Sequence, residues 1–155
     1  LTHNHVEIDG CSIPTLEPTL NLLYTFLHLY HHLIELGVGL RQFCDVAILL
    51  KTYYNSIDEK QFFEWLDALD FRKAFEIVQM ILVDILGMDK KYALSPIVPD
   101  KESLKAINMF MDVVWFGGNF GFHGHNRKFR FKAQYFLMTT YRKLQLLSIL
   151  SFLTS

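Results

Sequence analysis

The chain has 155 residues, of which 51% are hydrophobic, 15% aromatic and 20% charged, and this composition excludes a disordered tail, a collagen-like repeat and a coiled-coil rod. Its formal net charge of -1 provides no global field that would attract nucleic acid or an anionic membrane, so we expect no nucleic-acid partner. Two cysteines, Cys11 and Cys44, are too few for the disulfide framework of a small secreted domain, which favours free thiols and a cytoplasmic location.

Glycine and proline divide the chain into apolar segments of helical length. The apolar spacing predicts helices over residues 16–36, 39–54, 58–69, 71–86, 100–116 and 129–153. Residues 88–99 contain two prolines and are expected to form a loop. Charged and histidine side chains interrupt the most apolar segment, residues 20–40, so no transmembrane segment is expected. We therefore predict an all-α bundle of about six helices with a short N-terminal strand.

Polar residues before the apolar segments mark the expected helix starts. Ser56 and Glu59 fit a capping box ahead of the third helix. Asp70 and Asp100 are expected to cap the fourth and fifth helices. The side chains expected to face the core are Leu40, Phe43, Cys44, Ala47, Ile48 and Leu50 on the second helix, and Phe75, Val78, Ile81, Leu82 and Ile85 on the fourth.

Polar and apolar residues alternate strictly near the N-terminus, from His3 to Asp9. If this segment is extended, His3, His5, Glu7 and Asp9 share one face, so that two carboxylates lie on one strand face. Paired carboxylates suit a divalent metal that bridges substrate phosphates. A frayed polar edge is the structural alternative, and the sequence alone favours that alternative.

Two histidines on the first predicted helix, His28 and His32, are four residues apart, and this spacing could bring both rings to one metal ion. No third ligand and no His-Glu-x-x-His pattern accompanies them. Histidines that form hydrogen bonds between helices are therefore the favoured interpretation.

A charged pair, Arg41 and Asp45, lies one turn apart on the second predicted helix. The two residues could form a surface ion pair. If they are buried, they would instead bind His28 or His32, and a phosphate-binding Arg41 is a further alternative. The glycine-rich segment 117–121 could form an anion-binding nest, although a turn between helices is the default interpretation.

Several of these segments together resemble the C-terminal half of the uncharacterised nucleotidyltransferase family of Bacteroidetes. The segments are His28-Leu-Tyr-His-His32, Gly39-Leu-Arg-Gln-Phe-Cys-Asp45, an Ile57-Asp-Glu helix start and Gly117-Gly-Asn-Phe-Gly121. Members of this family resemble polymerase-β-type enzymes, in which a small catalytic domain with a Gly-Ser turn and an Asp-x-Asp metal pair precedes a helical region. Neither the Gly-Ser turn nor the Asp-x-Asp pair occurs in this sequence.

The resemblance implies roles for individual residues. Residues 1–12 would be the remnant of, or the linker from, a preceding catalytic domain, and residues 13–155 would be the helical domain. Glu7 would be a metal-binding carboxylate, while Asp9 stands where the family tends to have histidine. The residues that would contact either the catalytic domain or the substrate and its phosphates are His28, His32, Arg41, Gln42, Asp45 and Asn119.

The resemblance also implies the chemistry of a longer parent protein. That protein would use Mg²⁺ to transfer a nucleotidyl group from an NTP to an unknown acceptor, and its own N-terminal catalytic domain would be a partner of this chain. We expect the present chain alone to be inactive and to hold no cofactor. The alternative is a non-enzymatic helical protein-interaction module. A helical nuclease of the HEPN type would need a histidine about five residues after an arginine, which we do not find here.

Overall fold

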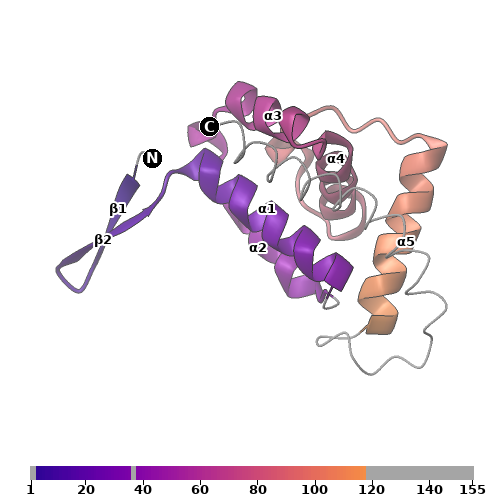
Figure 1. Cartoon of the computed structure of the whole chain (residues 1–155), viewed down its shortest axis with the longest axis horizontal. Helices are drawn as coiled ribbons and strands as arrows, with labels where there is room; N and C mark the ends of the chain where they lie inside the picture. The colour runs from indigo at the N-terminus through magenta and orange to yellow at the C-terminus, as the bar shows by residue number, and fades with distance from the viewer. Residues whose placement is uncertain (1–2, 36–37, 118–155) are drawn as a thin grey trace, which may run out of the picture.

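Helices make up most of the described chain, which in this computed structural model comprises residues 3–35 and 38–117. A β-hairpin of β1 (His3–Ile8) and β2 (Cys11–Leu16) leads into α1 (Pro18–Glu35) and α2 (Leu40–Tyr53), as Figure 1 shows. They are followed by α3 (Glu59–Ala68), α4 (Arg72–Met80) and α5 (Lys101–Gly117). The all-α prediction is confirmed. The helix expected over residues 129–153 lies outside the described residues, as does Asn119.

The N-terminal strand pairs with a second strand that the sequence analysis did not predict. β1 and β2 are antiparallel, with Val6 opposite Ile13 and Glu7 opposite Ser12. Asp9 and Gly10 form the connecting turn with φ of 50° and 77°, a left-handed geometry that an Asp-Gly pair favours. Asp9 therefore lies in the turn and not on the strand face that carries Glu7. The prediction that the two carboxylates share one strand face is wrong. The boundary expected after residue 12 falls within β2, and the division into domains stays a prediction.

Aromatic side chains from three helices form the centre of the core. The ring of Phe75 on α4 lies edge-on to Phe26 on α1, with the centroids 5.3 Å apart, and it lies 4.8 Å from Phe62 on α3. All three side chains are fully buried. Edge-to-face pairs of this kind add to the hydrophobic contribution of their burial, so this cluster joins α1, α3 and α4.

The core-facing side of α2 differs from the prediction. Phe43, Val46 and Leu50 are buried, as their spacing of three and four residues on one helix face requires. Cys44 and Ile48 were expected to face inward, but Cys44 is exposed and Ile48 is 60% exposed. The predicted stripe was too wide because the apolar residues of α2 extend beyond the face that contacts the rest of the body.

Two of the expected helix caps are replaced by neighbouring residues. Ser56 lies in a 3₁₀ turn (Tyr54–Ser56), and Asp58 caps α3 by accepting a hydrogen bond from the backbone N–H of Gln61 at 3.0 Å. Asp58 also donates its backbone N–H to the Thr19 hydroxyl at 3.0 Å, which joins the starts of α1 and α3. Asp70 is not the cap of α4, because it adopts a left-handed φ of 58° and Phe71 takes the cap position.

The predicted fourth helix is divided in two. After Met80 the chain forms a π-helical turn, Ile81–Ile85, closed by the Leu86 N–H donating to the Ile81 carbonyl at 3.0 Å. A π turn holds an extra residue, so side chains within it and after it are rotated around the axis relative to those of a continuous α-helix. Ile85 was expected to face the core and is instead 45% exposed.

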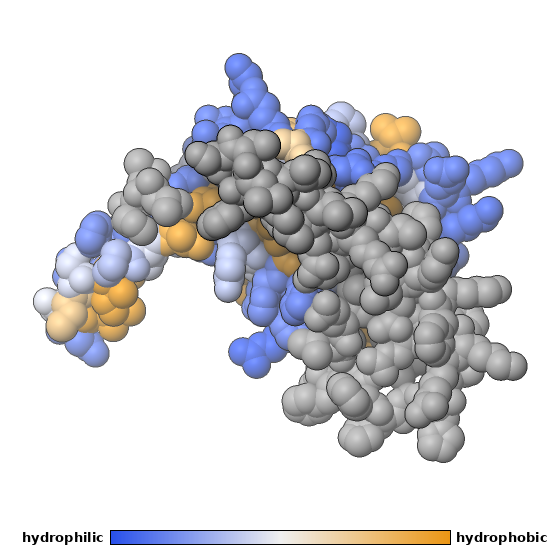
Figure 2. Space-filling model, viewed as in Figure 1, coloured by the Kyte–Doolittle hydropathy of each residue, from blue (hydrophilic) through white to orange (hydrophobic). Residues whose placement is uncertain are grey.

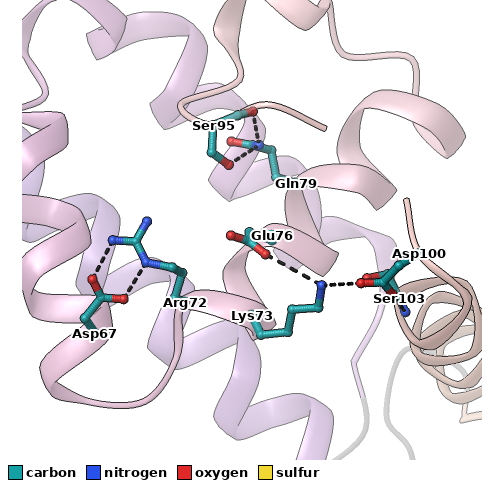
Figure 3. Close-up of polar contacts among 8 residues, drawn as sticks. All are labelled: Asp67, Arg72, Lys73, Glu76, Gln79, Ser95, Asp100 and Ser103. Atoms are coloured by element: carbon teal, nitrogen blue, oxygen red, sulfur yellow. Dashed lines mark hydrogen bonds and ion pairs between the residues drawn. The ribbon is translucent and has the colours of Figure 1, made fainter. Parts of the chain in front are cut away.

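Polar side chains of α4 bind the segment that follows the π-helical turn and the residue that precedes α5 (Figure 3). Buried Gln79 donates to the Ser95 carbonyl and hydroxyl at 2.9 and 3.0 Å and accepts from the Leu94 N–H at 2.8 Å. Lys73 lies 2.9 Å from the Asp100 carboxylate. Asp100 also accepts the backbone N–H of Ser103 at 2.6 Å, which confirms its predicted capping role.

Candidate functional site

Three aromatic rings follow one another along the exposed side of α1. The Nε2 atoms of His28 and His32 are 3.1 Å apart, so one ring donates a hydrogen bond to the other. The Tyr24 ring is stacked on His28, with 6.1 Å between centroids and 9° between planes. The interpretation that these histidines form hydrogen bonds between helices is wrong for this pair, since the hydrogen bond that joins their rings lies within α1.

Two effects lower the pKa of His32. Partial burial disfavours the charged imidazolium, and the neighbouring His28 and His31 disfavour a further positive charge. His32 therefore keeps its neutral form to lower pH than an isolated histidine does. A neutral imidazole offers an unprotonated nitrogen to a hydrogen-bond donor or a metal ion.

Arg41 and Asp45 of α2 do not form the buried contact with His28 or His32 that one interpretation expected. Arg41 and Asp45 are both exposed. Among the residues that the structure describes, no ion pair joins them to each other or to His28 and His32. The buried alternative is therefore wrong, and both charges face solvent.

Gln42 has a structural role that the sequence analysis did not assign to it. Its side-chain oxygen accepts the backbone N–H of Gly39 at 3.1 Å, at the start of α2. This hydrogen bond is one half of a capping box, in which the side chain of the third helical residue accepts the backbone N–H of the N-cap residue. The Gly39-Leu-Arg-Gln segment thus explains where α2 begins.

An open groove of about 570 Å³, which the sequence did not predict, lies beside α2. One side is formed by α2 and the other by the segment that follows the π-helical turn. Its lining includes the apolar Ile48 and Leu86, the lysines Lys51 and Lys91, and Tyr92. Cys44 and Ile48 could have indicated this groove from the sequence. A helix with apolar residues outside its core-facing side exposes a second apolar surface, and such a surface is typical of a binding site.

Glu7 lies exposed on β1, opposite Ser12. Within residues 3–35 and 38–117, no group of three or more His, Cys, Asp or Glu side chains lies close enough together to hold a metal ion. Mg²⁺ usually takes one or two protein carboxylates together with water and substrate phosphates. Glu7 can contribute one such carboxylate, and these described residues do not complete a Mg²⁺ site.

Both cysteines are free, as predicted, and both are exposed, including Cys44, which was expected to face the core. Across the described ranges, none of the helices has the length and apolar character needed to cross a bilayer.

A family model described as an uncharacterised nucleotidyltransferase matches residues 1–87, which extend from the hairpin to the glycine after the π-helical turn. Neither a curated protein nor a solved structure matches the chain.

Proposed function

Because the chain belongs to the uncharacterised nucleotidyltransferase family, we propose that it is the helical domain of an enzyme that transfers a nucleotidyl group from an NTP to an acceptor. The family match carries this proposal, since it covers the hairpin and the first four α-helices in one continuous segment. The catalytic Gly-Ser and Asp-x-Asp motifs are absent from this sequence. In this proposal they belong to a catalytic domain of the same protein that precedes Leu1.

Mg²⁺ belongs to that preceding domain in our proposal, with Glu7 as one carboxylate added from this chain. Exposure of Glu7 on a strand that projects from the helical body supports this assignment (Figure 1). The described residues supply no second and third ligand, so we derive no catalytic step from this chain. The free thiols support our proposal of a cytoplasmic enzyme.

We propose Arg41 as the residue of this chain that contacts either nucleotide phosphate or the catalytic domain. Its guanidinium is exposed and no ion pair within the described ranges occupies it. An unpaired guanidinium can bind phosphate or carboxylate with two parallel hydrogen bonds. Asp45, His28 and His32 lie on the same pair of helices and stay candidates for this contact, whereas Gln42 is used in capping α2. Asn119 stays a candidate outside the described residues.

The second candidate function is a protein-interaction module without catalysis. The open groove beside α2 favours it, because exposed Ile48 and neighbouring apolar side chains offer a surface for a partner. NTP binding distinguishes this interaction module from the nucleotidyltransferase domain proposed above.

The test is titration calorimetry of each NTP with Mg²⁺ against this chain and against the protein extended upstream of Leu1. The proposal expects saturable binding by the extended protein and Asp-x-Asp after Gly-Ser in the preceding sequence. Arg41→Gln in the extended protein should weaken NTP binding or activity, and Lys60→Gln, at an exposed position of α3, is the matched control. Absence of NTP binding by both proteins would favour the interaction module.

A further inference from the structure

We propose that His28 and His32 form a two-histidine clamp for a divalent transition-metal ion on the exposed side of α1. Their Nε2 atoms are 3.1 Å apart. The site is separate from the Mg²⁺ chemistry proposed above, because it uses nitrogen ligands on a helix rather than Glu7 of the hairpin and the carboxylates of a preceding domain. Its test is correspondingly independent of nucleotide transfer.

The distance between the two nitrogens suits one shared ion. An ion about 2.0–2.1 Å from each nitrogen, the usual metal–imidazole distance, would subtend an angle of roughly 100° across the 3.1 Å separation. That angle lies between about 90° for square-planar and about 109° for tetrahedral coordination. Binding of one ion would replace this hydrogen bond with two metal bonds, and the rings would turn so that both Nε2 lone pairs point at the ion.

The two rings are supported by their surroundings. Leu29 and Leu33, each one residue after a histidine of the pair, are buried, so this part of α1 packs against the core. The Tyr24 ring stacks on His28 at an angle of 9° between planes and restricts the orientation of that imidazole. A ligand pair held on a packed helix loses less conformational freedom on binding than a pair on a loop.

Imidazole pairs favour late first-row ions over hard cations. Affinity for nitrogen ligands rises toward Cu²⁺ and is lower for Zn²⁺, whereas Mg²⁺ prefers oxygen. Among the described residues no third side chain joins the pair. The other coordination positions are then filled by water or by a ligand from outside, which leaves this site open rather than closed.

The experiment titrates the purified chain with Cu²⁺ and Zn²⁺ by calorimetry, with electron paramagnetic resonance of the Cu²⁺ form. We expect one ion per chain at this site, in place of the expectation from the sequence that the chain alone holds no cofactor, with nitrogen splittings in the Cu²⁺ spectrum. Since losing an outer partner of a ligand already costs about 10–100-fold in affinity, His28→Gln or His32→Gln should weaken binding at least about tenfold. The control His5→Gln removes an exposed histidine of the hairpin and should change nothing.

Two results would overturn the proposal. One is wild-type binding that does not saturate, which would leave the pair as a hydrogen bond alone. The other is unchanged one-to-one binding in the double variant His28→Gln/His32→Gln, which would place the ion elsewhere. Far-UV circular dichroism verifies that α1 is retained in each variant, and NTP binding can persist or fail without affecting either result.

Discussion

The helical body and the N-terminal hairpin use their apolar residues in different ways. In the body, Phe26, Phe62 and Phe75 are fully buried against one another. In the hairpin, Val6, Ile8 and Ile13 are 41%, 52% and 43% exposed, and Figure 2 shows hydrophobic residues on its visible surface. A two-stranded hairpin is at best marginally stable alone in water. The body is thus stabilised by its own core, while the hairpin has an apolar face without a core.

The largest expected effect tests this contrast directly. Phe75→Ala removes a fully buried ring that contacts Phe26 and Phe62, and it should lower the free energy of unfolding by about 3–5 kcal/mol. Ile8→Ala on the hairpin should change it by less than about 0.5 kcal/mol, because that side chain is already half exposed. Urea denaturation measures both. Equal losses would show that the hairpin shares the core of the body.

A smaller effect is expected for the buried polar side chain of the body. Gln79→Ala leaves the Leu94 N–H and the Ser95 carbonyl without the partner that they have in the wild type. Burying such groups unpaired costs about 1–3 kcal/mol, so the same denaturation experiment should show a loss in that range. Gln61→Ala on the exposed side of α3 is the control and should have little effect. A neutral Gln79→Ala would mean that the loop after α4 reorganises freely.

A pH-dependent effect is expected where α5 begins. The Ser103 N–H and the Lys73 ammonium hold the pKa of Asp100 well below its usual range. The charged form therefore stabilises the folded state above the pKa of the unfolded chain, and this contribution is lost as pH falls toward the folded pKa. Asp100→Asn keeps an acceptor oxygen but removes the charge, so it should lower Tm at pH 7.

The difference in Tm between Asp100→Asn and wild type should narrow as pH falls from about 5 to about 2. Asp84→Asn, at an exposed position in the π-helical turn, is the control for a general loss of negative charge. A gap that stays constant with pH would contradict the assignment of the effect to the Asp100 carboxylate.

The smallest effect is expected on the exposed side of α2. Asp45→Ala should change the free energy of unfolding by less than about 0.5 kcal/mol, because the carboxylate is exposed and no ion pair in the described ranges involves it. Thermal or urea denaturation measures the change. A loss comparable to that of Gln79→Ala would show that Asp45 has a buried partner after all, and would place it with the stabilising contacts of the body.

Local signals in the sequence predicted most helix positions, and they failed where neighbouring residues competed for one role. Ser56 and Asp58 both offer a side-chain oxygen near the start of α3, and the structure uses Asp58. Asp70 has the right chemistry for a cap but occupies a left-handed position one residue too early. The Asp9-Gly10 turn was readable from its residue types, and the second strand could have been inferred from it.

The sequence by itself determined the helical class, the two free thiols, the start of α5 at Asp100 and the spacing of His28 and His32, because these follow from composition and from contacts within one turn. Only the tertiary structure decided that Cys44, Ile48 and Ile85 face outward, that Arg41 and Asp45 are exposed, and that a groove lies beside α2. Which side of an apolar helix is covered depends on the elements that pack against it. Residue periodicity alone does not specify which side of the helix faces the core. A π turn also changes which side chains face the core from that turn onward.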